Sequence, residues 1–151
     1  MRTINQIILH CSDSSFGDVA TIRDWHLERN FSDIGYHHVI LNGVRHYGSV
    51  YDESLDGVIE HGRPIETPGA HCKGQNEDSI GICLIGKNSF TCEQMFNLRN
   101  LLLNLMKKHD LKPENVYPHH HYNLNKSCPN WDIDDIRGRL RTVKVKIYNT
   151  D

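Results

Sequence analysis

Two short apolar runs constrain the fold of this chain more than any other feature. One is Ile7 to Leu9, and the other is Ser79 to Ile85. A strand with one face in water alternates apolar and polar residues, whereas a strand covered on both faces is continuously apolar. Runs this short are also below the usual length of a buried helix. Both therefore predict strands in the middle of a sheet that helices cover on both faces.

Three segments have the pattern of helices. Residues 19–30 place four side chains on one helical face, namely Ile22, Trp25, His26 and Arg29. A second helix is expected after Thr91, because Thr91 and Gln94 match a capping box. Its buried stripe would be Met95, Leu98, Leu102, Leu105 and Met106. Residues 131–140 predict a final short helix capped by Asp132.

Further strands are expected at residues 36–41 and 116–117, with a short hairpin within 44–51 and a loop at 52–57. Strands and helices therefore interleave along the chain, which is typical of an α/β fold with a mixed sheet. The length of 151 residues fits one domain, residues 1–151, with helices flanking a central sheet.

Composition excludes several classes of function. The formal net charge is -2 and the 17 Lys and Arg residues are scattered, which argues against nucleic acid as a ligand. No run approaches the roughly 20 apolar residues of a membrane span, and the N-terminus lacks the apolar core of a signal peptide. The five cysteines have no framework spacing, so we expect reduced thiols in a chain made in the cytoplasm. We expect a monomer.

Histidine is unusually frequent, with 11 residues, and imidazole is the commonest metal ligand. His10 ends the first apolar run, and His120 and Cys128 lie eight residues apart across a polar loop. Catalytic zinc takes three such protein ligands and leaves one position for water. Spacing alone leaves another interpretation open, in which His10 packs at a strand end, residues 119–121 are a solvated tract and Cys128 is a small core residue.

Seven short motifs occur in an order that resembles the zinc-dependent N-acetylmuramoyl-L-alanine amidases of phage-lysozyme type, which are related to peptidoglycan recognition proteins. They lie at residues 7–12, 25–26, 35–37, 62–64, 69–74, 76–86 and 120–129. Together they cover the chain from about residue 4 to residue 136. The resemblance implies that the protein hydrolyses the amide bond between N-acetylmuramic acid and the L-alanine of the stem peptide, with a muropeptide as substrate and Zn²⁺ as cofactor.

The resemblance also implies roles for individual residues. His10, His120 and Cys128 would hold the metal in a surface cleft, because the family's second histidine lies eight residues before its cysteine. In an extended segment His119 and His121 share the face opposite to His120, so they are expected as neighbours, and one is a fallback ligand if the register slips.

Three more residues correspond to the family's site. Tyr36 and Lys126 would lie beside the metal, where a donor and a cation stabilise the oxyanion that forms when hydroxide adds to the amide. His71 would contact the substrate or the transition state. Residues 46–61 are longer than the matching segment of compact relatives, so we expect a lid or a wall of the cleft there.

Three hypotheses follow for the biological role. The first is a phage or prophage-type endolysin, which acts on the cell wall after release or delivery. The second is a recognition module that binds peptidoglycan without cutting it, as relatives do when a zinc ligand such as the cysteine is replaced. Cys128 is present, which favours the enzyme. The third is an added regulatory protein partner, which no residue pattern tests.

Overall fold

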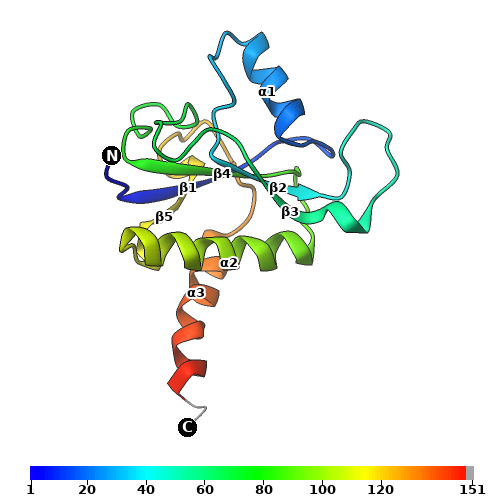
Figure 1. Ribbon diagram of the computed structural model, residues 1–151. Coiled ribbons are helices and arrows are strands. Elements are labelled where there is room, and N and C mark those ends of the chain that lie inside the picture. The colour runs from blue at the N-terminus through cyan, green and yellow to red at the C-terminus, as the bar shows by residue number, and fades with distance from the viewer. Residues whose placement is uncertain (149–151) are drawn as a thin grey trace.

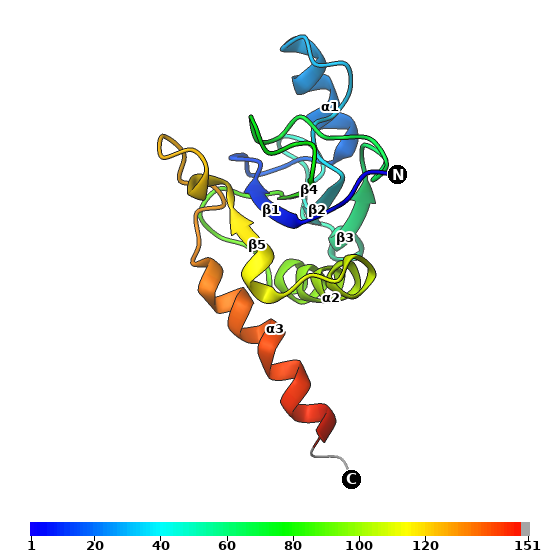
Figure 2. The same cartoon turned by 90° about the vertical axis from the view of Figure 1, so that its left-hand side faces the viewer.

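The computed structural model describes residues 1–148, which form three layers with a five-stranded sheet in the middle. Helix α1 (Val19–Glu28) lies on one face of the sheet and α2 (Cys92–His109) on the other (Figure 1). The strands are β1 (Gln6–Cys11), β2 (His38–Asn42), β3 (Asp56–His61), β4 (Ser79–Leu84) and β5 (Val116–Pro118). Helix α3 (Ile133–Tyr148) extends away from the sheet on the α2 side (Figure 2). Three short 3₁₀ turns complete the elements, at Glu53–Leu55, Pro113–Asn115 and His119–His121.

The strand order is β3-β2-β4-β1-β5. Only β2 and β3 pair antiparallel, and every other pair is parallel. The two apolar runs of the sequence are β1 and β4, which lie side by side and are buried along their whole length. The α/β class, the mixed sheet and the two central strands are therefore as predicted.

Helix α2 confirms its sequence pattern in detail. The Thr91 side chain accepts a hydrogen bond from the Gln94 amide, and the Gln94 side chain accepts one from the Thr91 amide. The Gln94 amide group is fully buried and also donates to the carbonyls of Ile40 and Ile85. The capping side chain thus ties the start of α2 to the sheet. The predicted stripe packs into the core, with Leu98, Leu102 and Leu105 buried and Met95 and Met106 partly buried.

The hairpin is misplaced in the sequence prediction. No strand forms within residues 44–51, and the antiparallel partner of β2 is β3, whose first residues were expected in a loop. Long-range contacts hold β3 in place, because the Asn97 side chain on α2 donates to the Gly57 carbonyl at 2.7 Å and the Thr91 hydroxyl donates to Asp56 at 2.6 Å. A pattern of neighbouring residues in the sequence cannot reveal such long-range contacts.

Smaller differences concern element ends and burial. Tyr36 precedes β2 instead of lying in it, and α3 begins at Ile133, with the Asp132 carboxylate accepting from the amide of Asp134. His37 and His38 are adjacent in the chain and both buried, because both faces of the sheet are covered.

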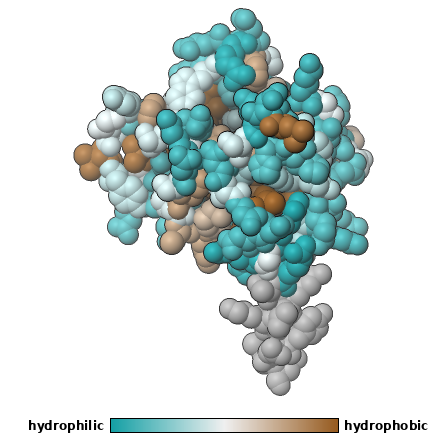
Figure 3. Space-filling model, turned by 180° about the vertical axis from the view of Figure 1, so that it is seen from behind, coloured by the Kyte–Doolittle hydropathy of each residue, from teal (hydrophilic) through white to brown (hydrophobic). Residues whose placement is uncertain are grey.

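The surface is predominantly polar. The face opposite to that of Figure 1 shows separate, small apolar patches among hydrophilic residues (Figure 3). Among residues 1–148, no helix combines the length and the apolar character needed to cross a bilayer.

Candidate active site

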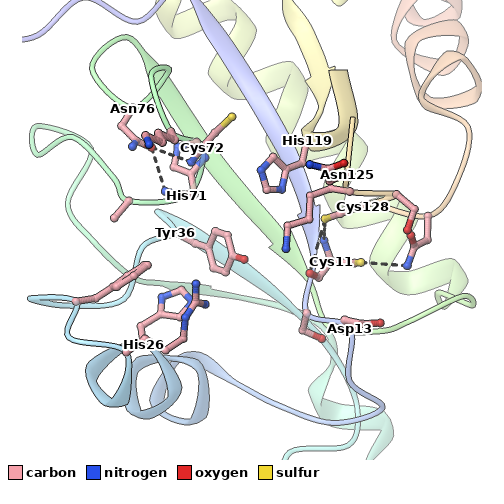
Figure 4. A pocket seen from close by; sticks show the side chains of 18 of the residues that line it. Cys11, Asp13, His26, Tyr36, His71, Cys72, Asn76, His119, Asn125 and Cys128 are labelled. Carbon is pink, nitrogen blue, oxygen red and sulfur yellow. Dashed lines mark hydrogen bonds between the residues drawn. The ribbon is translucent and has the colours of Figure 1, made fainter. Parts of the chain in front are cut away.

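The site lies where the parallel strands β1 and β5 end. Leu9 pairs with Pro118 in the register of these strands, so the next residue of each, His10 and His119, emerges at the same place. Their ring centroids are 4.5 Å apart. Cys128 approaches from the loop that follows, and the backbone amide of Cys11 donates to its sulfur at 2.9 Å. Figure 4 shows Cys128 beside His119 and Cys11.

His10, His119 and Cys128 form a group with the chemistry of a metal site. One ligand atom from each lies within 4.8 Å of the others. Among the described residues, this is the only cluster of three or more His, Cys, Asp or Glu side chains close enough to share a metal ion. Two imidazole nitrogens and one thiolate are a donor set that catalytic zinc sites use, with the fourth position left open. Burial, with the neighbouring His71 next, lowers the pKa of His10 well below its usual range. His10 is therefore neutral, which is the form that binds a metal.

His120, which the eight-residue spacing predicted, is not part of this group. Residues 119–121 form a 3₁₀ turn and not an extended segment, so the alternation assumed for them does not apply. The turn rotates His121 onto the Tyr117 ring, at 4.9 Å between centroids. The amide of His120 donates to the Cys128 carbonyl at 3.1 Å, which closes the loop from its backbone. His119, which the sequence offered as a fallback ligand, lies in the group where His120 was expected.

Further bonds fix the loop that carries His119 and Cys128. The Tyr122 hydroxyl donates to the side-chain oxygen of Gln6 on β1, and the Asn130 side chain donates to the Lys87 carbonyl at 2.7 Å. One bond lies on each side of the loop. They tie the loop that carries His119 and Cys128 to β1 and to the segment after β4.

Tyr36 lies beside the group, as the sequence predicted. Its ring centroid is 5.0 Å from that of His10. Burial, together with the nearby thiols of Cys83, Cys128 and Cys11, raises the pKa of the Tyr36 phenol well above its usual range. The phenol is therefore protonated at neutral pH and can donate a hydrogen bond, but it cannot serve as an anionic base.

Lys126 is exposed at the edge of the same cleft. Its charge is close enough to His119 to contribute to the lowered pKa of that imidazole, after burial as the main cause. The structure therefore brings Lys126 to the group, as predicted, and leaves its ammonium in contact with solvent.

An open cleft of about 640 Å³ is lined by His119, Cys128 and the neighbouring Tyr36, whereas His10 is buried and is not among the lining residues (Figure 4). This volume is in the range of small-molecule and peptide sites. Arg29, Lys73 and Lys126 line it together with one acidic residue, Asp13. No residue of the 46–61 segment lines it, so the expected lid or wall is not formed by that segment, whose second half is the edge strand β3.

His71 lines the cleft but has little freedom to contact a ligand. Its Nδ1 lies 2.9 Å from His10 Nε2, and its Nε2 lies 3.2 Å from the Ser79 hydroxyl. Both ring nitrogens therefore already have partners inside the protein. The expected substrate contact would have to displace one of them.

His26 lines the cleft, although no role was expected for it from the sequence. The Gly35 amide donates to its Nδ1 at 2.8 Å, so the ring proton is on Nε2. Burial lowers the pKa of His26 to about 4, which keeps the ring neutral. His26 lies below Tyr36 in Figure 4. Its position directly after Trp25 on the inner face of the first helix was the only signal in the sequence.

The mixed sheet and the His/His/Cys group at the ends of its strands define a class: α/β domains with a candidate metal centre in an open cleft. The family model described as N-acetylmuramoyl-L-alanine amidase matches residues 1–131. The endolysin of Enterobacteria phage T3 is 35% identical over 142 residues, covering 87% of this chain and 83% of the relative. The endolysin of Escherichia phage T7 is 36% identical over 143 residues, covering 87% and 84%.

Solved structures agree. The N-acetylmuramoyl-L-alanine amidase LysC from Clostridium intestinale superposes with a TM-score of 0.79 at 26% identity, covering 93% of this chain and 87% of that one. Drosophila PGRP-LB shares the fold, with a TM-score of 0.66 at 24% identity over 93% of this chain and 78% of that one. The chain belongs to the N-acetylmuramoyl-L-alanine amidase family. It is a peptidoglycan hydrolase that acts on an amide bond.

Proposed function

We propose that this chain is an endolysin-type amidase that cuts between the lactyl group of N-acetylmuramic acid and the L-alanine of the stem peptide. The observation that carries the proposal is the meeting of His10, His119 and Cys128 beside Tyr36, with His119, Cys128 and Tyr36 lining one open cleft. A single chain supplies every one of these residues, which supports a monomer as the working form.

In this proposal His10, His119 and Cys128 hold Zn²⁺. When bound, zinc polarises the amide carbonyl and makes hydroxide available near neutral pH. A hydrogen bond with Cys11 and burial raise the pKa of the Cys128 thiol, and coordination to Zn²⁺ would favour its thiolate form instead. The amide of Cys11, which points at the sulfur, stabilises the thiolate further.

Tyr36 and Lys126 then act on the charge that develops at the amide oxygen. Tyr36 supplies a hydrogen-bond donor, since its raised pKa keeps the phenol protonated. Lys126 supplies a positive charge at the open side of the cleft. Donors and cations already in place lower the barrier, because nothing has to reorganise as the charge forms.

The charges of the cleft suit a muropeptide. Arg29, Lys73 and Lys126 line it against one carboxylate, Asp13. A stem peptide carries several carboxylates, so a net positive cleft attracts it and holds it by ion pairs. The remaining candidate is a recognition module that binds peptidoglycan without cutting it. The presence of Cys128 in the metal group favours cleavage.

Digestion of purified sacculi, followed by mass spectrometry of the soluble products, tests the proposal. We expect peptides with a free L-alanine amine and glycan strands with a free lactyl carboxyl group. The Cys128→Ser variant is the matched control, and it should still bind sacculi but release no peptide. Release of reducing sugars, or cuts within the stem peptide, would show that another bond is the target. Binding by the zinc-loaded wild type without any release would support the recognition module.

A further inference from the structure

We infer that His71 is a positioning residue that, together with Ser79, fixes the tautomer of His10 so that His10 Nδ1 is the atom that faces the metal. The inference rests on the zinc site proposed above. It assigns His71 a structural task toward that site in place of a contact with substrate.

A chain of hydrogen bonds runs from the metal group into the sheet. His10 Nε2 and His71 Nδ1 are 2.9 Å apart, and His71 Nε2 lies 3.2 Å from the hydroxyl of Ser79, the first residue of β4. The two rings are nearly perpendicular, at 89°. His10, His71 and Ser79 are all buried, with exposed fractions of 1%, 8% and 0%. Water therefore does not compete for these bonds.

The ring of His71 sits in a slot that two glycines leave open. A Cβ atom on Gly81 would lie 2.6 Å from the His71 ring, and one on Gly69 would lie 2.7 Å from the same ring. Side chains at these positions would therefore push the ring out of the slot. The Asn76 side chain accepts from the amide of His71 at 3.0 Å and fixes its backbone. The two glycines and the Asn76 hydrogen bond together fix the position of the His71 ring.

The direction of the hydrogen bonds decides whether His10 can bind a metal. His10 Nε2 is engaged by His71, so Nδ1 is the nitrogen left for a ligand. Nδ1 has a free electron pair in neutral imidazole only if the proton is on Nε2. That proton is then donated to His71 Nδ1, and His71 in turn donates from Nε2 to the Ser79 oxygen. In the reverse direction the proton would be on His10 Nδ1 and would block the metal.

Outer partners of this kind orient a ligating histidine and set its tautomer, and their loss typically costs about 10–100-fold in metal affinity. His71 has the position, the burial and the free electron pair for this task. It acts through His10 and does not touch the reacting atoms.

The decisive experiment compares two substitutions of nearly equal size. In His71→Asn the amide oxygen can take the place of Nδ1 and accept from His10, whereas His71→Leu fills the slot without an acceptor. Zinc affinity is measured for each purified protein by competition with a chromophoric chelator. We expect the Leu variant to bind zinc about 10–100-fold more weakly than the wild type and the Asn variant to stay within a few-fold. Gly81→Ala, which displaces the ring, should resemble the Leu variant.

Each outcome bears on one proposal. A wild type that takes up no zinc would overturn the metal site itself. A Leu variant with wild-type affinity would overturn the positioning role of His71, and equal losses in the Leu and Asn variants would overturn the acceptor mechanism. Should the variants fail to fold, ring ¹H–¹⁵N spectra of the zinc-loaded wild type give the tautomers directly. Protons on Nε2 of both His10 and His71 are expected, and a proton on Nδ1 of His71 would contradict the inference.

Discussion

The ring of His119 lies 4.5 Å from the ring of His10, centroid to centroid, because β1 and β5 run parallel and Leu9 pairs with Pro118, the residue before each histidine. Counting back from Cys128 selects His120 instead. The strand register and the sequence spacing thus select neighbouring residues in a run of three histidines. A pair of single substitutions distinguishes them.

We expect His119→Ala to abolish stoichiometric zinc binding and His120→Ala to leave it nearly unchanged. Loss of an outer partner already costs about 10–100-fold in metal affinity, so loss of a ligand should cost more than that. Chelator competition on the two purified variants measures the difference. The reverse result, with zinc lost only in His120→Ala, would return the assignment to the eight-residue spacing.

Tyr36→Phe should retain zinc but lose activity. The substitution keeps the ring that packs 5.0 Å from His10 and removes the hydroxyl proposed as the donor to the oxyanion. Removal of one such donor typically costs about 100–1,000-fold in kcat. Peptide release from sacculi, measured at equal zinc content, checks this. Tyr51→Phe is the matched control, because Tyr51 donates to Asp56 away from the cleft and should behave as the wild type. Full activity in Tyr36→Phe would remove Tyr36 from the mechanism.

Acid should destabilise the protein between about pH 6.5 and pH 4. Burial, as the largest cause, lowers the pKa of His26, His37 and His38 to about 4 each. Unfolded histidine titrates near pH 6.5, so below that pH the unfolded state binds more protons than the folded state. The stabilisation is thus fully present above about pH 6.5 and is lost as the pH falls toward 4. Each histidine adds a slope of at most about 1.4 kcal/mol per pH unit.

Urea unfolding of the zinc-free protein at pH 7, 6, 5 and 4.5 measures this slope. His38→Leu is an informative variant, because the Nε2 atom of His38 is buried without a hydrogen-bond partner. The variant should lose one buried titrating group and show a shallower slope. Because the cause is burial and not repulsion between surface charges, 0.5 M salt should leave the slope almost unchanged. A slope that salt abolishes would contradict this explanation.

The sequence predicted those parts of the fold that rest on local patterns. The apolar runs of β1 and β4 and the capping box at Thr91 each concern residues close together in the chain, and all are present. Strand β3 was missed because it begins with Asp56 and Gly57, which are typical of turns, and because its place depends on contacts with α2, about 40 residues away.

The site shows the same division. His10, Tyr36 and Cys128 were found from motifs, and the structure brings them together. The sequence favoured His120 and kept His119 as a fallback, because it does not reveal that residues 119–121 turn as a 3₁₀ helix and bring His119 into the group. The partners of His71 could not be foreseen either, since Ser79 and His10 are 8 and 61 residues away in the chain and the folded structure places one at each ring nitrogen of His71.

A last prediction concerns the edge strand that the sequence missed. Gly57 has a φ of +79°, and a Cβ atom there would lie 2.8 Å from the Glu93 carbonyl oxygen of α2. Gly48 has a similar φ of +75° but no atom within 4 Å of the added Cβ. Gly48→Ala should therefore cost only backbone strain, about 1 kcal/mol, whereas Gly57→Ala adds a clash with main-chain atoms and should cost about 2–4 kcal/mol.

Urea unfolding of the two variants at pH 7 separates strain from contact. Because both glycines have left-handed backbones and both lie outside the cleft, the difference between them isolates the packing of β3 on α2. Zinc affinity should be unaffected in either variant, since β3 is at the opposite edge of the sheet from β5. Equal stability losses in Gly57→Ala and Gly48→Ala would mean that α2 does not hold β3 in the way the Asn97–Gly57 hydrogen bond indicates.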